Sequence, residues 1–396
     1  MQCGRPLLLR QPFPPDAFDQ VILGCVNVIA DEMNPARVAA LRLGMGEAMT
    51  AFTVQINCGS GMQSIDTAFR YIREGSADLI LAGGAESLSH APLVYSRSAV
   101  NWYAKLFGAR TLAARLAAVF AVRPSFFKPV IGLERGLTDP ITDLNMGQTA
   151  ELVAHLFHIT RRQADEYAAE SQQRLAAAQK DGHFAGEVEP AFARDGQVYD
   201  HDDGVRPDST ADSLAKLKPA FERPWGKVTP GNSSQITDGA SWVILASEDA
   251  IQRYKLNPKA VIVDSEWSAL DPSVMGLGPV YCSTALLKRH ELSLGDIELW
   301  ELNEAFAAQV LGCLAAWEDA EFCRDALGLP DAAGRIPRER LNVDGGAIGT
   351  GHPVGASGNR IVLHLVNAMK RLGVKRGIAT ECIGGGQGGA MLIEAI

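Results

Sequence analysis

The sequence lacks several features that would assign it to a particular class of protein. No apolar run reaches the roughly 18 residues that a membrane-spanning helix needs. The segment 1–15 contains neither the apolar core nor the small-residue cleavage site of a signal peptide. The seven cysteines are odd in number and form no C-x-x-C pair, which argues against a disulfide framework and against a zinc site. These absences predict a cytoplasmic protein without a metal ion.

Basic charge is also scarce relative to acidic charge. The 396 residues include 37 Lys and Arg against 46 Asp and Glu, which gives a net charge of −9. A nucleic-acid partner requires a basic face, so general nucleic-acid binding is not expected. The hydrophobic content of 47% is too high for a disordered chain and is sufficient for a large core in two domains.

What the chain does contain is an alternation of strand-like and helix-like segments, which is typical of an α/β protein. Val21–Gly24 and Asp78–Ala82 read as buried parallel strands, and Ser64–Arg73 has the apolar spacing of a helix. Another helix is predicted at Thr160–Asp181 with Thr160 as its N-cap. Further strands are predicted at Asp238–Ser247, Ala260–Ser265, Ile297–Glu301 and Gly377–Cys382, and the last helix at about Gly358–Leu372.

Two segments, one in each half, share a layout. The turn Asn57–Gly61 leads to a helix and then to the strand sequence ADLILAGG at 77–84. The turn GTGHPVGASG at 349–358 leads to a helix and then to RGIATECIGGG at 376–386. The similarity indicates an internal duplication in which two equivalent halves meet at their turns.

The stretch 88–225 has a different texture. From Ser87 to Leu133 there is no Asp or Glu, whereas six Lys and Arg are interleaved with aromatic and aliphatic residues. One interpretation of residues 97–128 is a basic amphipathic helix pair that lies on an anionic membrane or on a partner protein. The other interpretation is an ordinary insertion that folds onto the body of the protein.

Cys58, in the sequence NCGSG, is a candidate nucleophile. It follows a predicted strand and precedes a helix, so the positive end of the helix dipole is expected to stabilise a thiolate and to lower the pKa of the thiol. Free N–H groups in the same turn are able to hold an oxyanion. The alternative is a buried, inert cysteine.

His352 and Cys382 are candidates for proton transfer. His352 lies in GHPVG, where proline and glycine fix the direction of the chain and allow close approach of another segment. Cys382 ends a predicted strand and precedes IGGGQGG, which matches neither a dinucleotide-binding fingerprint nor a phosphate-binding loop. A thiol at that position is a suitable acid or base for a carbon atom.

Asn303 and Glu304, in the sequence NEAF, follow the predicted strand IELWEL. Polar groups at the carboxyl end of a strand lie where α/β sheets usually bind ligands. The alternative is that these residues cap the following helix.

Taken together, the motifs resemble the thiolase family over nearly the whole chain. The matching segments are NCGSG around Cys58, GNSSQITDGAS at 231–241, NEAF at 303–306, GHPVGASG at 351–358 and CIGGGQGGAM at 382–391. Within that family, the basic insertion and the segment KLKPAF at 216–221 are most similar to degradative 3-ketoacyl-CoA thiolases, including the β-subunits of fatty-acid oxidation complexes.

The resemblance implies a duplicated fold with five layers, α-β-α-β-α, and an inserted loop domain. On this basis the N-terminal half is expected at 1–245, with the loop domain at 88–225, and the C-terminal half at 246–396. It also implies a homodimer or homotetramer, acyl-CoA and CoA as substrates, and no other cofactor. A hydratase/dehydrogenase subunit is a further possible partner.

The resemblance also implies residue roles. Cys58 would be the acylated nucleophile, His352 its base, and Cys382 the group that moves the proton at the α-carbon of acetyl-CoA. Asn303 and His352 would hold a water that polarises the thioester carbonyl. The remaining implied roles are a second oxyanion site at the N–H groups of Cys58 and Gly384, pantetheine contacts at Ser234 and Met146, and an acyl pocket at Phe306.

Two departures from the family pattern are visible. The family's first strand and helix, with an Arg-Thr-Pro motif, have no counterpart in this chain, so we expect an edge or gap in the N-terminal half of the sheet. In addition, Asn145-Met146 stands where many relatives have His-Met.

The sequence therefore leaves three functions open. Thiolytic cleavage of 3-ketoacyl-CoA to acetyl-CoA and a shortened acyl-CoA, through an acyl-cysteine, fits the motifs best. A biosynthetic acetoacetyl-CoA thiolase is the nearest alternative. A non-catalytic acyl-CoA-binding or scaffold subunit is the third.

Overall fold

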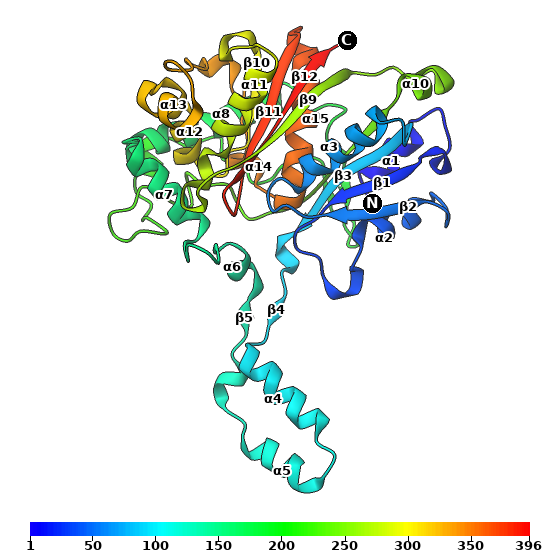
Figure 1. Ribbon diagram of the computed structural model, residues 1–396, viewed down its shortest axis with the longest axis vertical. Helices are drawn as coiled ribbons and strands as arrows, with labels where there is room; N and C mark the ends of the chain where they lie inside the picture. Colours follow the sequence, from blue (N-terminus) through cyan, green and yellow to red (C-terminus); the bar gives the residue numbers. More distant parts are fainter.

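The body of the protein is built on two four-stranded sheets, as seen in the computed structural model, which describes all residues from 1 to 396 (Figure 1). The strand order is β2-β1-β3-β8 in the first sheet and β10-β11-β12-β9 in the second. The first sheet contains β1 (Gln20–Gly24), β2 (Thr50–Val54), β3 (Leu79–Ser87) and β8 (Asp238–Ala246). The second contains β9 (Ala260–Ala269), β10 (Leu299–Leu302), β11 (Arg376–Ile383) and β12 (Gln387–Ala395).

Both sheets mix parallel and antiparallel pairs. β1 runs parallel to β2 and β3, and β8 runs antiparallel to β3. In the second sheet β10 and β11 are parallel, and β12 is antiparallel to both of its neighbours. β1 and β3 are the parallel pair that the sequence predicts. β3 continues through Gly83 and Gly84 to Ser87, further than predicted, because β8 pairs with it over its full length.

Helices fill the space between the sheets and cover both outer faces. Between the sheets lie α3 (Ser60–Arg73) and α15 (Val354–Leu372), whose apolar side chains form one core with the inner faces of both sheets. The outer face of the first sheet packs against α1 (Gly4–Leu9), α2 (Pro35–Arg42) and α10 (Glu248–Tyr254). The outer face of the second packs against α11 (Gly278–Arg289), α12 (Ala307–Glu318) and α8 (Arg161–Lys180), with α13 (Ala320–Leu327) alongside. The order is therefore helix, sheet, helix, sheet, helix, and the predicted five-layer fold is confirmed.

The two central helices begin earlier than the sequence predicts, at Ser60 and Val354 instead of Ser64 and Gly358. The reason lies in glycines that sequence reasoning places outside a helix. A Cβ atom on Gly61 would lie 2.6 Å from the backbone nitrogen of Asn359, and one on Gly358 would lie 2.6 Å from that of Met62. Glycine lets the first turns of α3 and α15 cross in direct backbone contact.

The first sheet ends at β8. In the second sheet β12 has a strand on each side, β11 and β9, whereas β8 pairs with β3 alone. Both open four-stranded sheets have two edge strands, so the strand that is missing from the family pattern stays a prediction. Part of β8 is covered by α1, because Leu8 and Trp242 belong to the same buried cluster.

The chain between β3 and β8 is long. It contains α6 (Gly132–Gly136), α7 (Met146–Leu156), α8, α9 (Ala211–Leu214) and the short strands β6 (Ala191–Phe192) and β7 (Val198–Tyr199). α8 begins after Thr160, whose hydroxyl accepts the backbone N–H of Gln163 at 3.2 Å. The predicted N-cap is therefore confirmed.

A helical hairpin extends away from the body (Figure 1). It consists of α4 (Arg97–Gly108) and α5 (Leu112–Phe120) on a stalk formed by β4 (Leu93–Val94) and β5 (Val130–Ile131). Between Leu93 and Ile131 only Ala99 and Phe126 are buried. The interpretation of this segment as an insertion folded onto the body is therefore wrong. Neither these helices nor any other in the structure has the length and hydropathy needed to cross a membrane.

The glycine crossing gives a first prediction. Substituting Gly61→Ala should destabilise the fold by about 1–3 kcal/mol, because the added methyl group meets backbone atoms that cannot rotate away. Gly136→Ala is the matched control, since no atom lies within 4 Å of the Cβ it would add. The measurement is urea-induced unfolding of both variants. Equal unfolding midpoints for the two variants would contradict the proposed role of the crossing.

Candidate active site

Cys58 occupies a tight turn between β2 and α3. The preceding residue, Asn57, has a positive φ of 46°, a conformation that non-glycine residues adopt rarely. The turn is held by Ser60, whose hydroxyl donates to the carbonyl of Asn57 at 2.7 Å and accepts the N–H of Ile56 at 2.9 Å. The fold therefore fixes the position of the sulfur at the start of a central helix.

The loop after β11 meets this turn from the other half of the molecule. The amide of Asn57 donates to the carbonyl of Gly384 at 2.8 Å. The backbone N–H groups of Gly384 and of Cys58 itself both face the Cys58 sulfur. Two N–H donors, one from each half, thus converge at one sulfur atom, in the way that an oxyanion site requires.

The protonation state of Cys58 differs from the sequence prediction. Burial raises the pKa of the Cys58 thiol to about 12, and the two N–H groups reduce this effect only in part. The prediction of a lowered pKa is wrong because desolvation of this half-buried thiol outweighs the N–H groups that face it. Cys58 is therefore a neutral thiol in the resting protein and needs a base.

His352 is uncharged in the resting protein, because burial also disfavours the charged form of its imidazole. Burial and the charge of Arg360 lower the pKa of its imidazole to about 4. Nδ1 lies 2.6 Å from the hydroxyl of Ser357, which donates to the carbonyl of Pro353 at 3.2 Å. These two contacts favour the tautomer in which Nδ1 donates to Ser357 and Nε2 is the acceptor.

Asn303 lies directly beside His352. Its backbone N–H donates to Thr380 on β11 at 2.9 Å, and its side-chain nitrogen lies 3.4 Å from Nε2 of His352. Its side-chain oxygen is buried without a partner. The alternative interpretation as a helix cap is wrong, because α12 begins only at Ala307 and its N-cap is Phe306.

Cys382 completes the cluster from β11. The residue is buried, and the pKa of its thiol is raised well above the ordinary value by burial and then by the negative charge that Cys58 would carry. The two sulfurs are therefore close enough to influence each other's ionisation. The structure thus places Cys58 beside Cys382 and Asn303 beside His352, and the hydrogen bond from Asn303 to Thr380 joins the second pair to the strand that carries Cys382.

The three predicted substrate contacts border this cluster. The sulfur of Met146, at the start of α7, would lie 3.2 Å from a Cβ on Gly384. Ser234 donates its N–H to the carbonyl of Ala305 at 3.0 Å. Phe306 is buried in the same apolar cluster as Cys382. Asn145, the departure from the family pattern, caps α7 through a capping box with Gln148.

The sequence suggests that Glu304 binds a ligand or caps a helix, but in the structure its carboxylate joins neighbouring segments. Its carboxylate is buried and accepts hydrogen bonds from Tyr167 at 2.8 Å, Ser171 at 2.7 Å, Asn342 at 3.0 Å and the N–H of Ile348 at 3.2 Å. It therefore ties α8 to the turn that leads to His352. Four donors on one carboxylate leave it without capacity for a substrate.

Glu86 is a second residue that sequence reasoning misses. It accepts the N–H groups of Val26 at 3.1 Å, Asn27 at 2.9 Å and Gly355 at 3.0 Å. Through Gly355 it ties the first sheet to the start of α15, immediately after His352. A buried acidic residue inside an apolar strand, as in LILAGGAES, is the signal that could have identified it.

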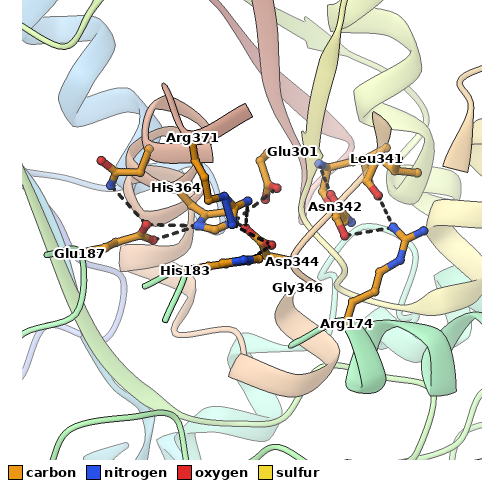
Figure 2. Close-up of polar contacts among 12 residues, drawn as sticks. Arg174, His183, Glu187, Glu301, Leu341, Asn342, Asp344, Gly346, His364 and Arg371 are labelled. Carbon is orange, nitrogen blue, oxygen red and sulfur yellow. Dashed lines mark hydrogen bonds and ion pairs between the residues drawn. The ribbon is translucent and has the colours of Figure 1, made fainter. Parts of the chain in front are cut away.

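Behind the site lies a buried ionic network centred on His364 (Figure 2). His364 Nδ1 lies 3.0 Å from Glu187, and Nε2 lies 3.3 Å from Asp344 and 3.8 Å from Glu301. Oδ1 of Asp344 also lies 2.8 Å from Nδ1 of His183 and accepts a hydrogen bond from Nη1 of Arg371 at 3.2 Å.

The network is charged as well as buried. Burial alone would lower the pKa of His364, but Glu301 and the contacts with Asp344 and Glu187 raise it to about 10. The same imidazolium holds the pKa of Asp344 below its ordinary value despite burial. Glu301 precedes Asn303 by two residues, and Asp344 precedes the turn that carries His352, so the network anchors both segments.

No cluster of three or more His, Cys, Asp or Glu side chains in the structure is arranged to hold a metal ion. The chemistry that this arrangement can perform is nucleophilic and acid–base: two thiols, a neutral imidazole, an amide and two N–H donors.

Comparisons with known proteins agree with this chemistry. Family descriptions of the thiolase N-terminal domain and of the thiolase C-terminal domain match residues 2–249 and 256–395. The mitochondrial trifunctional enzyme subunit beta of Bos taurus is 36% identical over 98% of this chain and 81% of its own length. An acetyl-CoA acetyltransferase of Chromobacterium violaceum is 37% identical over 98% of this chain and 91% of its own length.

Solved structures are also similar to this chain. Human mitochondrial 3-ketoacyl-CoA thiolase in complex with CoA has a TM-score of 0.84 and 36% identity to this chain, and the match covers 99% of this chain and 90% of that one. The names of these relatives include both 3-ketoacyl-CoA thiolase and acetyl-CoA acetyltransferase, so they share acyl transfer but not one acyl group.

The network around His364 gives a second prediction. His364→Leu should destabilise the fold by about 3–5 kcal/mol near neutral pH, because the carboxylates of Glu187 and Glu301 remain buried without this cation and Asp344 keeps only His183 and Arg371. His155→Leu on the exposed face of α7 is the control. Chemical unfolding of both variants and of the unmodified protein measures the difference.

The difference in stability between the unmodified protein and His364→Leu should also depend on pH. The folded pKa of about 10 lies above the ordinary value of 6.5, so protonated His364 contributes its full stability below pH 6.5 and loses it as the pH rises towards 10. The stability difference between the unmodified protein and His364→Leu should therefore narrow over that range. A difference that widens with pH would show that His364 is not a buried cation.

Proposed function

The chain belongs to the thiolase family of acyltransferases, and on that premise we propose that it cleaves 3-ketoacyl-CoA with CoA to give acetyl-CoA and a shortened acyl-CoA. The observation that carries the proposal is a pair of thiols from opposite halves, Cys58 and Cys382, with two N–H donors at the Cys58 sulfur. A neutral imidazole lies against Asn303, whose backbone is hydrogen-bonded to the strand that carries Cys382. Cleaving a carbon–carbon bond in this way needs a nucleophile for the ketone and a second acid for the departing carbon.

In the first half-reaction, Nε2 of His352 takes the proton of the Cys58 thiol. The thiolate attacks the ketone carbon of the substrate, and the resulting oxyanion is stabilised by N–H donors at the site. The bond between the α- and β-carbons breaks, and its electron pair remains on acetyl-CoA as an enolate. Cys382 donates its proton to that carbon and becomes a thiolate. The acyl group is now a thioester of Cys58.

In the second half-reaction, free CoA takes the place of acetyl-CoA. The Cys382 thiolate accepts the proton of the CoA thiol, whose sulfur attacks the Cys58 thioester. Cys58 leaves as a thiolate and recovers its proton from His352, so all three groups return to their starting state. This order of events predicts ping-pong kinetics.

The protonation states of the resting protein fit these roles. Cys382 has a raised pKa and is therefore protonated, as an acid that quenches an enolate must be. His352 has a lowered pKa and is therefore unprotonated, as a base must be. The two N–H groups at the Cys58 sulfur offset part of the cost of forming a thiolate there.

We assign the substrate contacts in the same way. Met146 and Ser234 are proposed to contact the pantetheine arm of CoA, and Phe306 to line the acyl pocket. Asn303, whose side-chain oxygen lacks a partner, is proposed to hold with His352 a water that polarises the thioester carbonyl. CoA enters as a substrate, and the steps above require no metal or redox group.

Fatty-acid β-oxidation is the proposed setting, in a homodimer or homotetramer in the cytoplasm. Support comes from the similarity to 3-ketoacyl-CoA thiolase and to the trifunctional enzyme subunit beta. The second candidate function is acetoacetyl-CoA synthesis from two molecules of acetyl-CoA, which the similarity to an acetyl-CoA acetyltransferase favours.

The test of this assignment is a thiolysis assay with two substrates, acetoacetyl-CoA and a long-chain 3-ketoacyl-CoA. A degradative thiolase should give a kcat/KM for the long chain at least equal to that for acetoacetyl-CoA. Turnover confined to acetoacetyl-CoA would favour the biosynthetic alternative. A folded protein without turnover on either substrate would favour the non-catalytic alternative.

The division of labour between the sulfurs gives a further prediction. Cys58→Ser should abolish the acetyl adduct that forms with acetyl-CoA, measured by intact mass. Cys382→Ser should retain that adduct and reduce exchange of the acetyl protons with solvent by several orders of magnitude, because a hydroxyl is a far weaker acid than a thiol. Cys3→Ser, near the N-terminus and away from the site, is the matched control. Loss of the adduct in Cys382→Ser with normal exchange would reverse the two roles.

A further inference from the structure

The hairpin of α4 and α5 has its large apolar side chains on the outside. Leu112, Leu116, Val119 and Phe120 of α5 lie at intervals that place them on one face of the helix. Their exposed fractions are 74%, 49%, 50% and 85%. No residue of α5 is buried.

The opposite face of α5 carries small residues and contacts α4. The indole nitrogen of Trp102, on α4, donates to the carbonyl of Ala118 at 2.8 Å. Ala114 lies one turn earlier on the same face. The hairpin thus turns its alanines towards α4, where Ala118 is half-buried, and directs leucine, valine and phenylalanine outward, the reverse of the arrangement in a water-soluble helix pair.

The hairpin is a formed unit despite its exposure. Trp102 packs against Tyr103 with ring centroids 4.7 Å apart and against Phe126 at 5.6 Å. Ser96 and Thr111 cap the two helices through their side chains. The exposed apolar face is therefore presented by an ordered structure.

The charge of the hairpin is opposite to that of the body. Six of the 37 cationic side chains, and none of the 46 anionic ones, lie between Ser87 and Leu133. The rest of the chain, with 31 cations and 46 anions, carries a net charge of −15. Figure 1 shows that the stalk holds the hairpin clear of this acidic body, with α5 at the far end. The separation matters because charges act only over about 10 Å at moderate salt.

We propose that this hairpin docks the protein onto an anionic phospholipid bilayer, with the outer face of α5 inserted among the lipids. An apolar face flanked only by cations matches a surface with anionic headgroups above an apolar interior. Arg115 on α5 and Arg110 just before it lie beside the apolar face and reach the headgroups. The nine residues of α5 are too few to span a bilayer, so the contact is peripheral. The stalk keeps the acidic body away from the anionic surface that would repel it.

The test uses vesicles of phosphatidylglycerol and phosphatidylcholine in equal parts, and vesicles of phosphatidylcholine alone. Co-sedimentation of the full-length protein should occur with the anionic vesicles and fall at high salt. Arg110→Glu with Arg115→Glu should weaken binding by at least about 25-fold, because each of the two lost cations contributes about fivefold near such a surface. Leu116→Gln with Phe120→Gln should weaken it by at least about tenfold.

The controls separate docking from folding and from general electrostatics. Arg324→Glu with Lys370→Glu makes the same charge change on exposed sites of the body and should leave binding unchanged. Circular dichroism and thermal melts of all three double variants should match the unmodified protein, because every substituted side chain is exposed.

Three outcomes would overturn the proposal. One is failure of the unmodified protein to sediment with anionic vesicles. Another is binding by both hairpin variants equal to that of the unmodified protein. A third is a lower oligomeric mass of the hairpin variants, measured by light scattering, together with no vesicle binding by the unmodified protein, which would assign the apolar face to a second copy of the chain.

Discussion

The site depends on the contact between the first turns of α3 and α15. These helices belong to different halves of the chain, and each begins directly after the loop that carries a reactive group, Cys58 in one case and His352 in the other. Gly61 and Gly358 bring their backbones together at distances that no side chain would allow. The loops that carry the sulfur and the imidazole are therefore brought together because two helix backbones touch.

Around this contact, buried carboxylates join segments in addition to the apolar packing of α3 and α15. Glu86 binds the first sheet to the start of α15, and Glu304 binds α8 to the turn before His352. Asp344 and His364 do the same for the segments behind the site. Hydrogen bonds to a carboxylate are directional, so these links fix position as well as proximity. The cost is that each carboxylate depends on its full set of partners.

Much of this could be predicted from the sequence, because the motifs carry local information. Strands such as β1, the N-cap at Thr160 and the glycine-rich turns follow from residue type and spacing. The first residues of α3 and α15 could not be predicted from the sequence. Glycine is unfavourable within a helix unless a second helix packs against it, and the sequence does not show that contact. The protonation of Cys58 did not follow either, because the removal of water is a property of the fold.

Long-range partners were likewise invisible in the sequence. Glu187 and His364 are 177 residues apart, and Glu86 and Gly355 are 269 apart, so no local pattern connects them. The same holds for the hairpin. Its basic charge could be predicted from the sequence, but its extension away from the body could not. The boundaries at 88, 225 and 245 remain predictions, because α7, α8 and α9 of the insertion share the core of the body while the hairpin does not.

Each half of the molecule supplies one sheet, one central helix and one sulfur, and the two N–H donors at Cys58 come one from each half. A single half on its own would hold a thiol without an imidazole, or an imidazole without the thiol it serves. Neither half alone therefore assembles the site, so folding must join both halves before the two N–H donors meet at Cys58.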